Sequence, residues 1–244
     1  MFAEITNIVP PNACETVSGR YVDVVTPDPE TIDIRDIAWA ICRQARFAGH
    51  TISEEVYGVG QHSSFVEALL FKAINKEYAG VPKLSDSLDK WLFDRGYGTQ
   101  YSSAVRLELR NNPRLQMGAL IHDGTEAYLV DLPSPVKRHP ALRTPYKELE
   151  AGVQQAIDTA FKLRELTDLE HAAITWADLM ALQIEAAMLM PSRGRGWNGD
   201  LPVFEISFMS VFDGPMHWRR AYDEFMKRFL ELQKALENEL TVNR

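Results

Sequence analysis

Cysteine, uninterrupted apolar stretches and positive charge are scarce in this sequence. Its 244 residues include two cysteines, too few for a disulfide framework, so we expect a protein of the reducing cytoplasm. No apolar run reaches the length of about 18 residues that spans a bilayer, so we expect no membrane partner. The net charge of -8 argues against binding to duplex nucleic acid and means that an anionic substrate would need a local cluster of Arg or Lys.

The sequence does contain a globular composition and extensive helical periodicity. It is 45% hydrophobic and 25% charged, as is typical of a soluble protein with a sizeable core. Apolar residues recur at helical spacing, and one short strand is expected over residues 21–25. We predict an all-α fold in a single domain over residues 1–244, with a core at about 18–190, a polar insertion at about 77–114 and a C-terminal helical extension at 191–244. Within it we expect helices at about 34–49, 60–70, 84–93, 145–163, 169–190 and 218–240, and one that starts at about 115, includes the segment around residue 122 and is broken by Pro133 and Pro135.

The most informative segment places His122 directly before Asp123 at the end of an apolar run. An imidazole nitrogen and a carboxylate oxygen side by side can bind one divalent cation. If the segment is helical, Glu126 lies one turn later on the same face. The pair alone is a weak signal, so its context has to carry the hypothesis.

Two further polar residues lie on apolar helical faces. His62 neighbours Phe65 and Leu69, where it is either a hydrogen-bonded core histidine or a metal ligand. Asp178 lies among apolar residues, and a buried carboxylate needs a metal, a hydrogen-bond donor or a cation such as Arg43 or Arg46.

These residues belong to a wider pattern that resembles the HD-domain metal-dependent phosphohydrolases. It is similar to the branch that contains bacterial and phage 5′-deoxynucleotidases, and to phage enzymes that hydrolyse dATP to deoxyadenosine and triphosphate. The matching segments run from about residue 18 to 190: SGRY (18–21), IRDIAWA (34–40), RFAGH (46–50), VGQHS (59–63), ALIHD (119–123), EAY (126–128), DLPSPVK (131–137), and Ala177 and Asp178 with Glu185 and Met190.

The resemblance implies an HD-domain helical bundle and one bound divalent metal ion, with no second metal. The expected ion is Zn²⁺, Co²⁺ or Mn²⁺, with Mg²⁺ as a further candidate. The implied protein ligands are His62, His122, Asp123 and Asp178. In this interpretation His62 is a ligand rather than a core histidine.

The resemblance also implies catalytic and substrate-binding residues. Glu126 is expected to act as general acid or base or to orient water, and Asp131 to be a second catalytic carboxylate. The alternatives are a solvated helix surface for both and a turn cap for Asp131. Arg46 is expected to bind phosphate, the Phe47 ring to pack on the nucleotide, and Lys137 to give a second phosphate contact.

Three features leave the interpretation open. Trp39 stands where this branch often has His, so a polar contact there is either missing or replaced by packing. The gap from His62 to His122 is longer than expected, and the insertion at about 77–114 accounts for it; that insertion shapes either substrate access or an oligomer contact. Arg193 and Arg195 lie in a Gly-rich loop that is either solvated or able to close over a polyphosphate.

The expected function is metal-dependent hydrolysis of the 5′-phosphate ester of a deoxynucleotide. The substrate is either a triphosphate such as dATP, which loses triphosphate, or a monophosphate, which loses phosphate. The alternatives are a non-catalytic nucleotide-binding HD module and an HD hydrolase of guanosine tetraphosphate or a cyclic nucleotide. A homo-oligomer is a possible assembly, and the cytoplasm would be the host's if the protein is viral.

Overall fold

Helices make up most of this protein, as predicted, in a computed structural model that describes residues 9, 11–75, 83–98, 103–197 and 199–242. Strand β1 (Ala13–Glu15) pairs antiparallel with β2 (Tyr21–Asp23), which lies within the predicted strand. The α-helices are α1 (Ile34–Ile41), α2 (Val59–Asn75), α3 (Lys83–Asp94), α4 (Ser103–Glu108), α5 (Pro113–Leu120), α6 (Glu126–Leu129), α7 (Ser134–Lys137), α8 (Pro140–Ala160), α9 (Asp168–Leu189) and α10 (Trp218–Val242). Short 3₁₀ helices are η1 (Pro29–Thr31), η2 (Arg46–Gly49) and η3 (Ile206–Val211).

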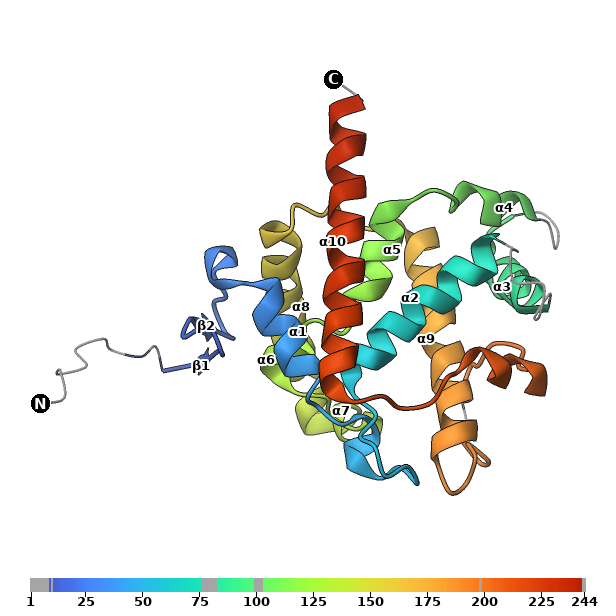
Figure 1. Cartoon of the computed structure of the whole chain (residues 1–244), viewed down its shortest axis with the longest axis horizontal. Helices are drawn as coiled ribbons and strands as arrows, with labels where there is room; N and C mark the ends of the chain where they lie inside the picture. Colours follow the sequence, from blue (N-terminus) through green and yellow to red (C-terminus); the bar gives the residue numbers. More distant parts are fainter. Residues whose placement is uncertain (1–8, 10, 76–82, 99–102, 198, 243–244) are drawn as a thin grey trace, which may run out of the picture.

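Helix α2 is central to the bundle. It packs against α9, α5, α10 and α3, and α10 runs across α1, α2 and α5 before its C-terminal end projects beyond the other helices (Figure 1). The apolar side chains form two clusters, one mainly on α2, α3 and α9 and the other mainly on α1, α5, α8 and α10. Helix α5 contributes Leu115 and Ala119 to the first cluster and Met117 and Leu120 to the second. Its C-terminal end, where His122 follows, is therefore held between both.

Helix α9 begins at a capping box and is deeply packed. The Thr167 hydroxyl accepts from the Glu170 backbone N–H, and the Glu170 carboxylate accepts from the Thr167 backbone N–H, which satisfies two groups that a helix start leaves unpaired. Among the described residues, α9 alone has the length and hydropathy of a membrane span, but 56% of that window is buried inside the structure, as expected for a central helix.

Three boundaries differ from the sequence prediction. Helix α1 ends at Ile41 rather than near Gly49 because the chain turns into η2, where Phe47 and Ala48 adopt left-handed backbone angles. Helix α8 begins at Pro140 rather than at Pro145, which lies inside the helix. Pro140 occupies the first helical position, where the missing N–H of a proline costs no helical hydrogen bond. The segment after α5 is not a continuous helix: residues 121–125 form a turn between α5 and α6.

The described part of the predicted insertion belongs to the core. Residues 77–82 and 99–102 lie outside the described part of the chain. The predicted short helix is confirmed as α3, which buries Leu84, Leu88 and Trp91 against α2 and α9. Buried Arg106 of α4 pairs with Asp89 at 3.0 Å, which ties α4 to α3.

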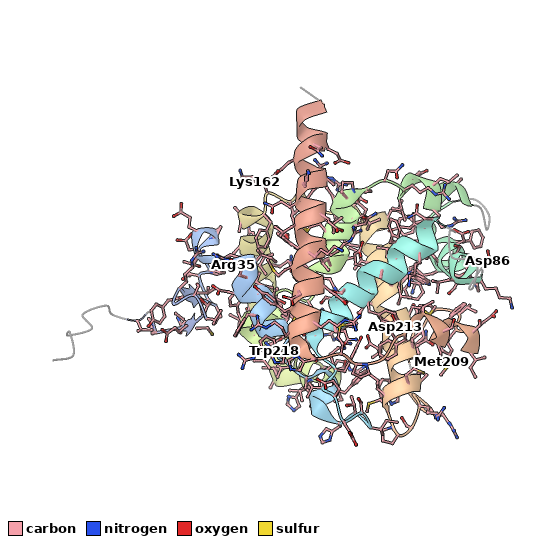
Figure 2. All side chains as sticks on the ribbon, viewed as in Figure 1. Arg35, Asp86, Lys162, Met209, Asp213 and Trp218 are labelled. Carbon is pink, nitrogen blue, oxygen red and sulfur yellow. The ribbon has the colours of Figure 1, made fainter. Side chains whose placement is uncertain are left out.

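Trp39 is used for packing between α1 and α10. Its ring meets Trp218, at the start of α10 (Figure 2), with centroids 5.2 Å apart, and Tyr222 with centroids 6.0 Å apart. The Arg43 and Arg219 guanidinium groups lie over the same rings. Trp39 therefore contributes an aromatic contact between α1 and α10 at this position.

Candidate metal centre

His62, His122 and Asp123 come together at one point. One side-chain ligand atom from each lies within 4.8 Å of the other two. The Asp123 Oδ2 atom is 3.5 Å from His62 Nε2 and 3.4 Å from His122 Nε2. His62 comes from the first turn of α2, and the other two come from the turn after α5. Residues 60 positions apart in the sequence thus form a possible metal-binding triad.

The position of His62 in the buried interior depends on a close approach between the end of α1 and the start of α2. A Cβ at Gly60 would overlap the Cys42 sulfur and press on the Cys42 backbone. Only glycine therefore lets the start of α2 pack directly against the end of α1. Two residues later, the His62 side chain is 0% exposed.

Hydrogen bonds at the Nδ1 atoms orient both imidazole rings. His122 Nδ1 lies 2.8 Å from the Ala119 carbonyl oxygen, and His62 Nδ1 lies 2.6 Å from Glu185 Oε1. Burial raises the pKa of Glu185, but His62 and Arg46 outweigh it and hold that pKa below its ordinary value. A carbonyl and a carboxylate only accept hydrogen bonds, so each Nδ1 donates, and in the neutral imidazole each Nε2 presents its lone pair to a metal.

The site contains buried polar atoms that have no aligned hydrogen-bond partner among the described residues. Of the seven such buried side-chain atoms in the described chain, five belong to Arg46, His62, His122, Glu126 and Glu185, and two of the five are the histidine Nε2 atoms. Two nitrogen lone pairs and a carboxylate aimed at one point fit a divalent cation. Burial and Arg46 lower the pKa of His62, but Glu185 and Asp178 raise it to about 9. These carboxylates thus favour positive charge at this point.

Asp178 of α9 lies next to the triad. Its Oδ1 atom is 3.1 Å from His62 Nε2 and 3.9 Å from His122 Nε2, and its side chain is 39% exposed. Burial raises its pKa, but His62, His122 and Arg46 outweigh burial and lower it. Asp178 is in reach of a cation that the two Nε2 atoms bind, although the compact three-residue group does not include it.

Glu126 is buried at the start of α6, and its carboxylate is held on one side. Lys137 Nζ donates to Glu126 Oε1 at 2.9 Å, while Oε2 has no hydrogen-bond partner in the part of the chain that the structure describes. Burial raises the pKa of Glu126, and Asp123 and Asp131 raise it further, to about 8, against the opposing charge of Lys137. The raised pKa favours the protonated form of Glu126, which is the direction that a general acid needs. Lys137 also lies 3.4 Å from Glu150, so its charge is shared between two carboxylates of the protein.

Gln44 joins the residues around Glu126, and the sequence analysis did not identify it. Its Nε2 atom donates to the Glu126 carbonyl at 2.9 Å, and its Oε1 atom accepts from the Asp131 backbone N–H at 3.2 Å. Burial raises the pKa of Asp131, partly opposed by Arg46. Asp131 is thus near the centre, but no ligand atom of it belongs to the triad.

Arg46 and Phe47 lie at the edge of the centre. Arg46 Nη1 is 3.4 Å from Asp123 Oδ2, and its side chain is 12% exposed. Its guanidinium lies over the Phe47 ring, and that ring meets Trp197 with centroids 5.9 Å apart. The left-handed backbone at Phe47 is uncommon for a residue with a side chain and is typical of functional sites. In contrast, Arg193, Arg195 and His50 are exposed.

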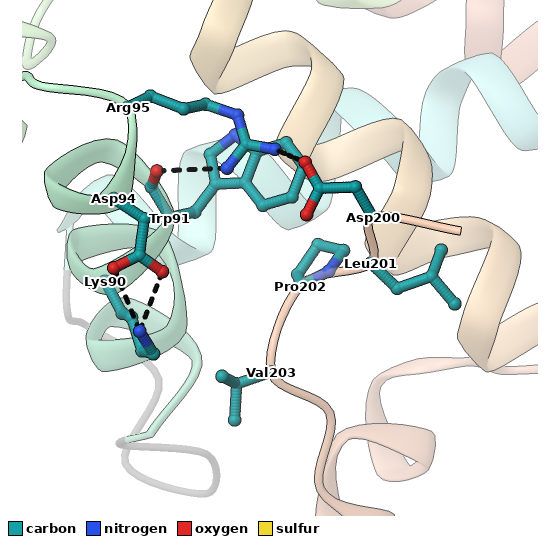
Figure 3. A pocket seen from close by; sticks show the side chains of 8 residues that line it. All are labelled: Lys90, Trp91, Asp94, Arg95, Asp200, Leu201, Pro202 and Val203. Carbon is teal, nitrogen blue, oxygen red and sulfur yellow. Dashed lines mark hydrogen bonds and ion pairs between the residues drawn. The ribbon is translucent and has the colours of Figure 1, made fainter. Parts of the chain in front are cut away.

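A separate pocket of about 360 Å³ lies between α3 and residues 200–203. In Figure 3, Arg95 bridges the Trp91 carbonyl and the Asp200 carboxylate, and Lys90 pairs with Asp94. None of the residues that line this pocket belongs to the candidate centre. The ion pair between Arg95 and Asp200 connects residues 200–203 to α3. We therefore do not assign this pocket to the candidate metal centre.

Comparisons with known proteins give relatives without a stated activity. No protein-family model matches the chain. The uncharacterized protein YfdR of Escherichia coli is 28% identical over 224 residues, which cover 90% of this chain and 95% of YfdR. An uncharacterized protein of Rhodobacter capsulatus is 28% identical over 174 residues, which cover 71% of this chain and 70% of that protein.

Proposed function

We propose that this protein is an HD-type metal-dependent phosphohydrolase that releases a deoxynucleoside from its 5′-phosphate ester. The observation that carries the proposal is the convergence on the Asp123 carboxylate of two histidine Nε2 atoms that have no aligned hydrogen-bond partner in the described part of the chain. The substrate is a deoxynucleoside triphosphate, with dATP as the first candidate, or a monophosphate. Both contain the same ester bond at the 5′ oxygen, so the same residues serve either one.

The metal ligands are His62, His122 and Asp123, with Asp178 as the fourth. When bound, a divalent cation neutralises phosphoryl oxygens and lowers the pKa of a bound water. The mixture of imidazole and carboxylate ligands suits Zn²⁺, Co²⁺ or Mn²⁺, and Mg²⁺ is a weaker candidate because it prefers oxygen ligands.

Glu126 is the proton donor of the reaction. Its pKa of about 8 keeps it protonated at neutral pH, close to the ideal for a general acid. Lys137 and the Gln44 amide fix its side chain and backbone, and its unpartnered Oε2 atom is left for the leaving 5′ oxygen. In this proposal Lys137 acts by holding Glu126, in addition to any phosphate contact.

Arg46 and Phe47 bind the substrate. The Arg46 guanidinium lies beside Asp123, where its remaining N–H groups can donate to a phosphate next to the metal. The Phe47 ring, with Trp197 behind it, offers an aromatic face to the nucleoside. Asp131 lies close enough to Arg46 for the two charges to act on each other, so it orients either Arg46 or water.

A nucleotide panel tests the proposal. Purified protein is incubated with deoxy- and ribonucleoside mono- and triphosphates, guanosine tetraphosphate and cyclic nucleotides, each with Co²⁺, Mn²⁺, Zn²⁺ or Mg²⁺, and products are separated by chromatography. We expect metal-dependent release of a deoxynucleoside. Tight nucleotide binding without turnover would instead favour a binding module, and turnover restricted to guanosine tetraphosphate or a cyclic nucleotide would change the substrate.

A further inference from the structure

Glu185 of α9 is a fully buried carboxylate with three different neighbours. Its Oε1 atom accepts from the Tyr57 hydroxyl at 2.7 Å and from His62 Nδ1 at 2.6 Å. Its Oε2 atom lies 3.3 Å from Arg46 Nε, as an ion pair that is not aligned as a hydrogen bond. A buried carboxylate is costly unless its partners stabilise it, so this arrangement needs an explanation.

We infer that Glu185 is a positioning residue that holds His62 in its metal-binding tautomer and keeps Arg46 beside the metal ligands. The inference rests on the proposed metal centre but not on the identity of the substrate. Because one oxygen faces His62 and the other faces Arg46, a single side chain links the ring that binds the metal to the cation that binds phosphate.

The two oxygens make the glutamate specific for this task. A glutamine has one accepting oxygen and one donating NH₂, but His62, Tyr57 and Arg46 all present donors to Glu185. If the NH₂ faces His62, it stabilises the tautomer with its proton on Nε2, which cannot bind a metal. If the NH₂ faces Arg46, two donors oppose each other and Arg46 is no longer held.

Metal affinity tests the first half of the inference. Zn²⁺ alone is titrated into the metal-free full-length chain by calorimetry, with no nucleotide present. Because outer partners of ligating histidines contribute about 10- to 100-fold to metal affinity, we expect Glu185→Gln to weaken Zn²⁺ binding by that factor. Glu185→Asp keeps the charge but no longer reaches His62, so it should weaken binding in the same direction and serves if the glutamine variant does not fold.

Glu67→Gln is the matched control. Glu67 is also a buried carboxylate paired with an arginine, since Arg228 contacts it at 2.6 Å, and it lies on α2 with His62 but away from the centre. We expect its Zn²⁺ affinity to equal that of the wild type. Zn²⁺ affinity within about twofold of the wild type in folded Glu185→Gln or Glu185→Asp would overturn the inference, since the effect expected of an outer ligand partner is larger.

Phosphate binding tests the second half. Inorganic phosphate is titrated into protein saturated with Zn²⁺, and we expect weaker binding in Glu185→Gln than in Glu67→Gln. Equal phosphate affinities would remove Arg46 from the inference. The outcomes are separate from the proposed function: a wild-type chain that binds Zn²⁺ but hydrolyses no nucleotide contradicts the proposed activity, and the effect of Glu185 on metal affinity can still be measured.

Discussion

Two polar clusters of this protein each contain a buried carboxylate but differ in their hydrogen bonding. At the start of α9, both oxygens of buried Glu170 are fully used: Arg164, Asn112 and Thr167 all donate to them, at 2.6–3.0 Å. At the candidate metal centre, His62 Nε2, His122 Nε2 and Glu126 Oε2 have no aligned hydrogen-bond partner among the described residues.

The difference separates a structural role from a binding role. Leaving a buried polar atom unpaired costs about 1–3 kcal/mol, so such atoms are rare in structural clusters. Their concentration at one point indicates a site whose partners are supplied by ligand atoms. The Glu170 cluster, which leaves nothing unpaired, should contribute to stability and not to activity. Variants that change stability without changing activity, or activity without stability, test this difference between the two clusters.

The largest effect is expected from Asp123→Asn. Loss of the carboxylate from the triad should reduce metal-dependent hydrolysis to the uncatalysed background, because the cation loses its one anionic ligand in the group. The free energy of unfolding of the metal-free protein should stay within about 1 kcal/mol of the wild type, since the site contains several other carboxylates. Product chromatography and urea unfolding measure the two. Full activity in this variant would show that the triad is not the reactive centre.

Glu126→Gln should lower kcat by about 10²- to 10⁴-fold, the usual contribution of general acid–base catalysis. Zn²⁺ affinity should be nearly unchanged, because Glu126 is not in the triad. Steady-state kinetics and calorimetry separate the two quantities. The control is Glu150→Gln, which removes only the more distant carboxylate partner of Lys137 and should alter kcat far less. Equal kcat values for the two variants would contradict the assignment of Glu126.

The third prediction concerns the satisfied cluster. Glu170→Gln should lower the free energy of unfolding by about 2 kcal/mol, because Arg164, Asn112 and Thr167 lose a charged acceptor. Activity measured at urea concentrations well below the unfolding midpoint of the variant should equal that of the wild type. The control is Glu224→Gln, which removes an exposed helical ion pair with Arg220 and should cost less than about 0.5 kcal/mol. Reduced activity in folded Glu170→Gln would mean that the two clusters are not independent.

Helical periodicity predicted the main helices well. The apolar faces of α2 and α9 and the short helix α3 were predicted because a buried stripe leaves a clear period in sequence. The turn at residues 121–125 was not predicted. Helix α5 ends after Leu120, but the sequence has no proline there and no glycine before Gly124 that would indicate this end. Helix α8 was shortened in the prediction because Pro145 was interpreted as its start rather than as an interior residue.

The candidate centre was predicted in part. The resemblance selected His62, His122 and Asp123, which the structure brings together. It did not supply the roles of Gln44, Tyr57 and Glu185, because their contacts join residues 82 to 128 positions apart, and periodicity contains no information on such pairs. The ammonium of Lys137 contacts two carboxylates of the protein, and its phosphate contact stays a prediction.

The smallest effect is the pH dependence of the Glu170 contribution. Burial raises the pKa of Glu170, but Arg164, Thr167 and Asn112 outweigh it and lower the pKa to about 2, from 4.5 for an ordinary glutamate. A group with a lowered pKa in the folded state stabilises the protein above the unfolded pKa and loses this effect as the pH falls through the folded value. The stability difference between wild type and Glu170→Gln should therefore be constant above pH 4.5 and shrink between pH 4.5 and about 2. Urea unfolding of both proteins at several pH values measures it, and a difference that does not change below pH 4.5 would mean that the Glu170 charge contributes nothing to the cluster.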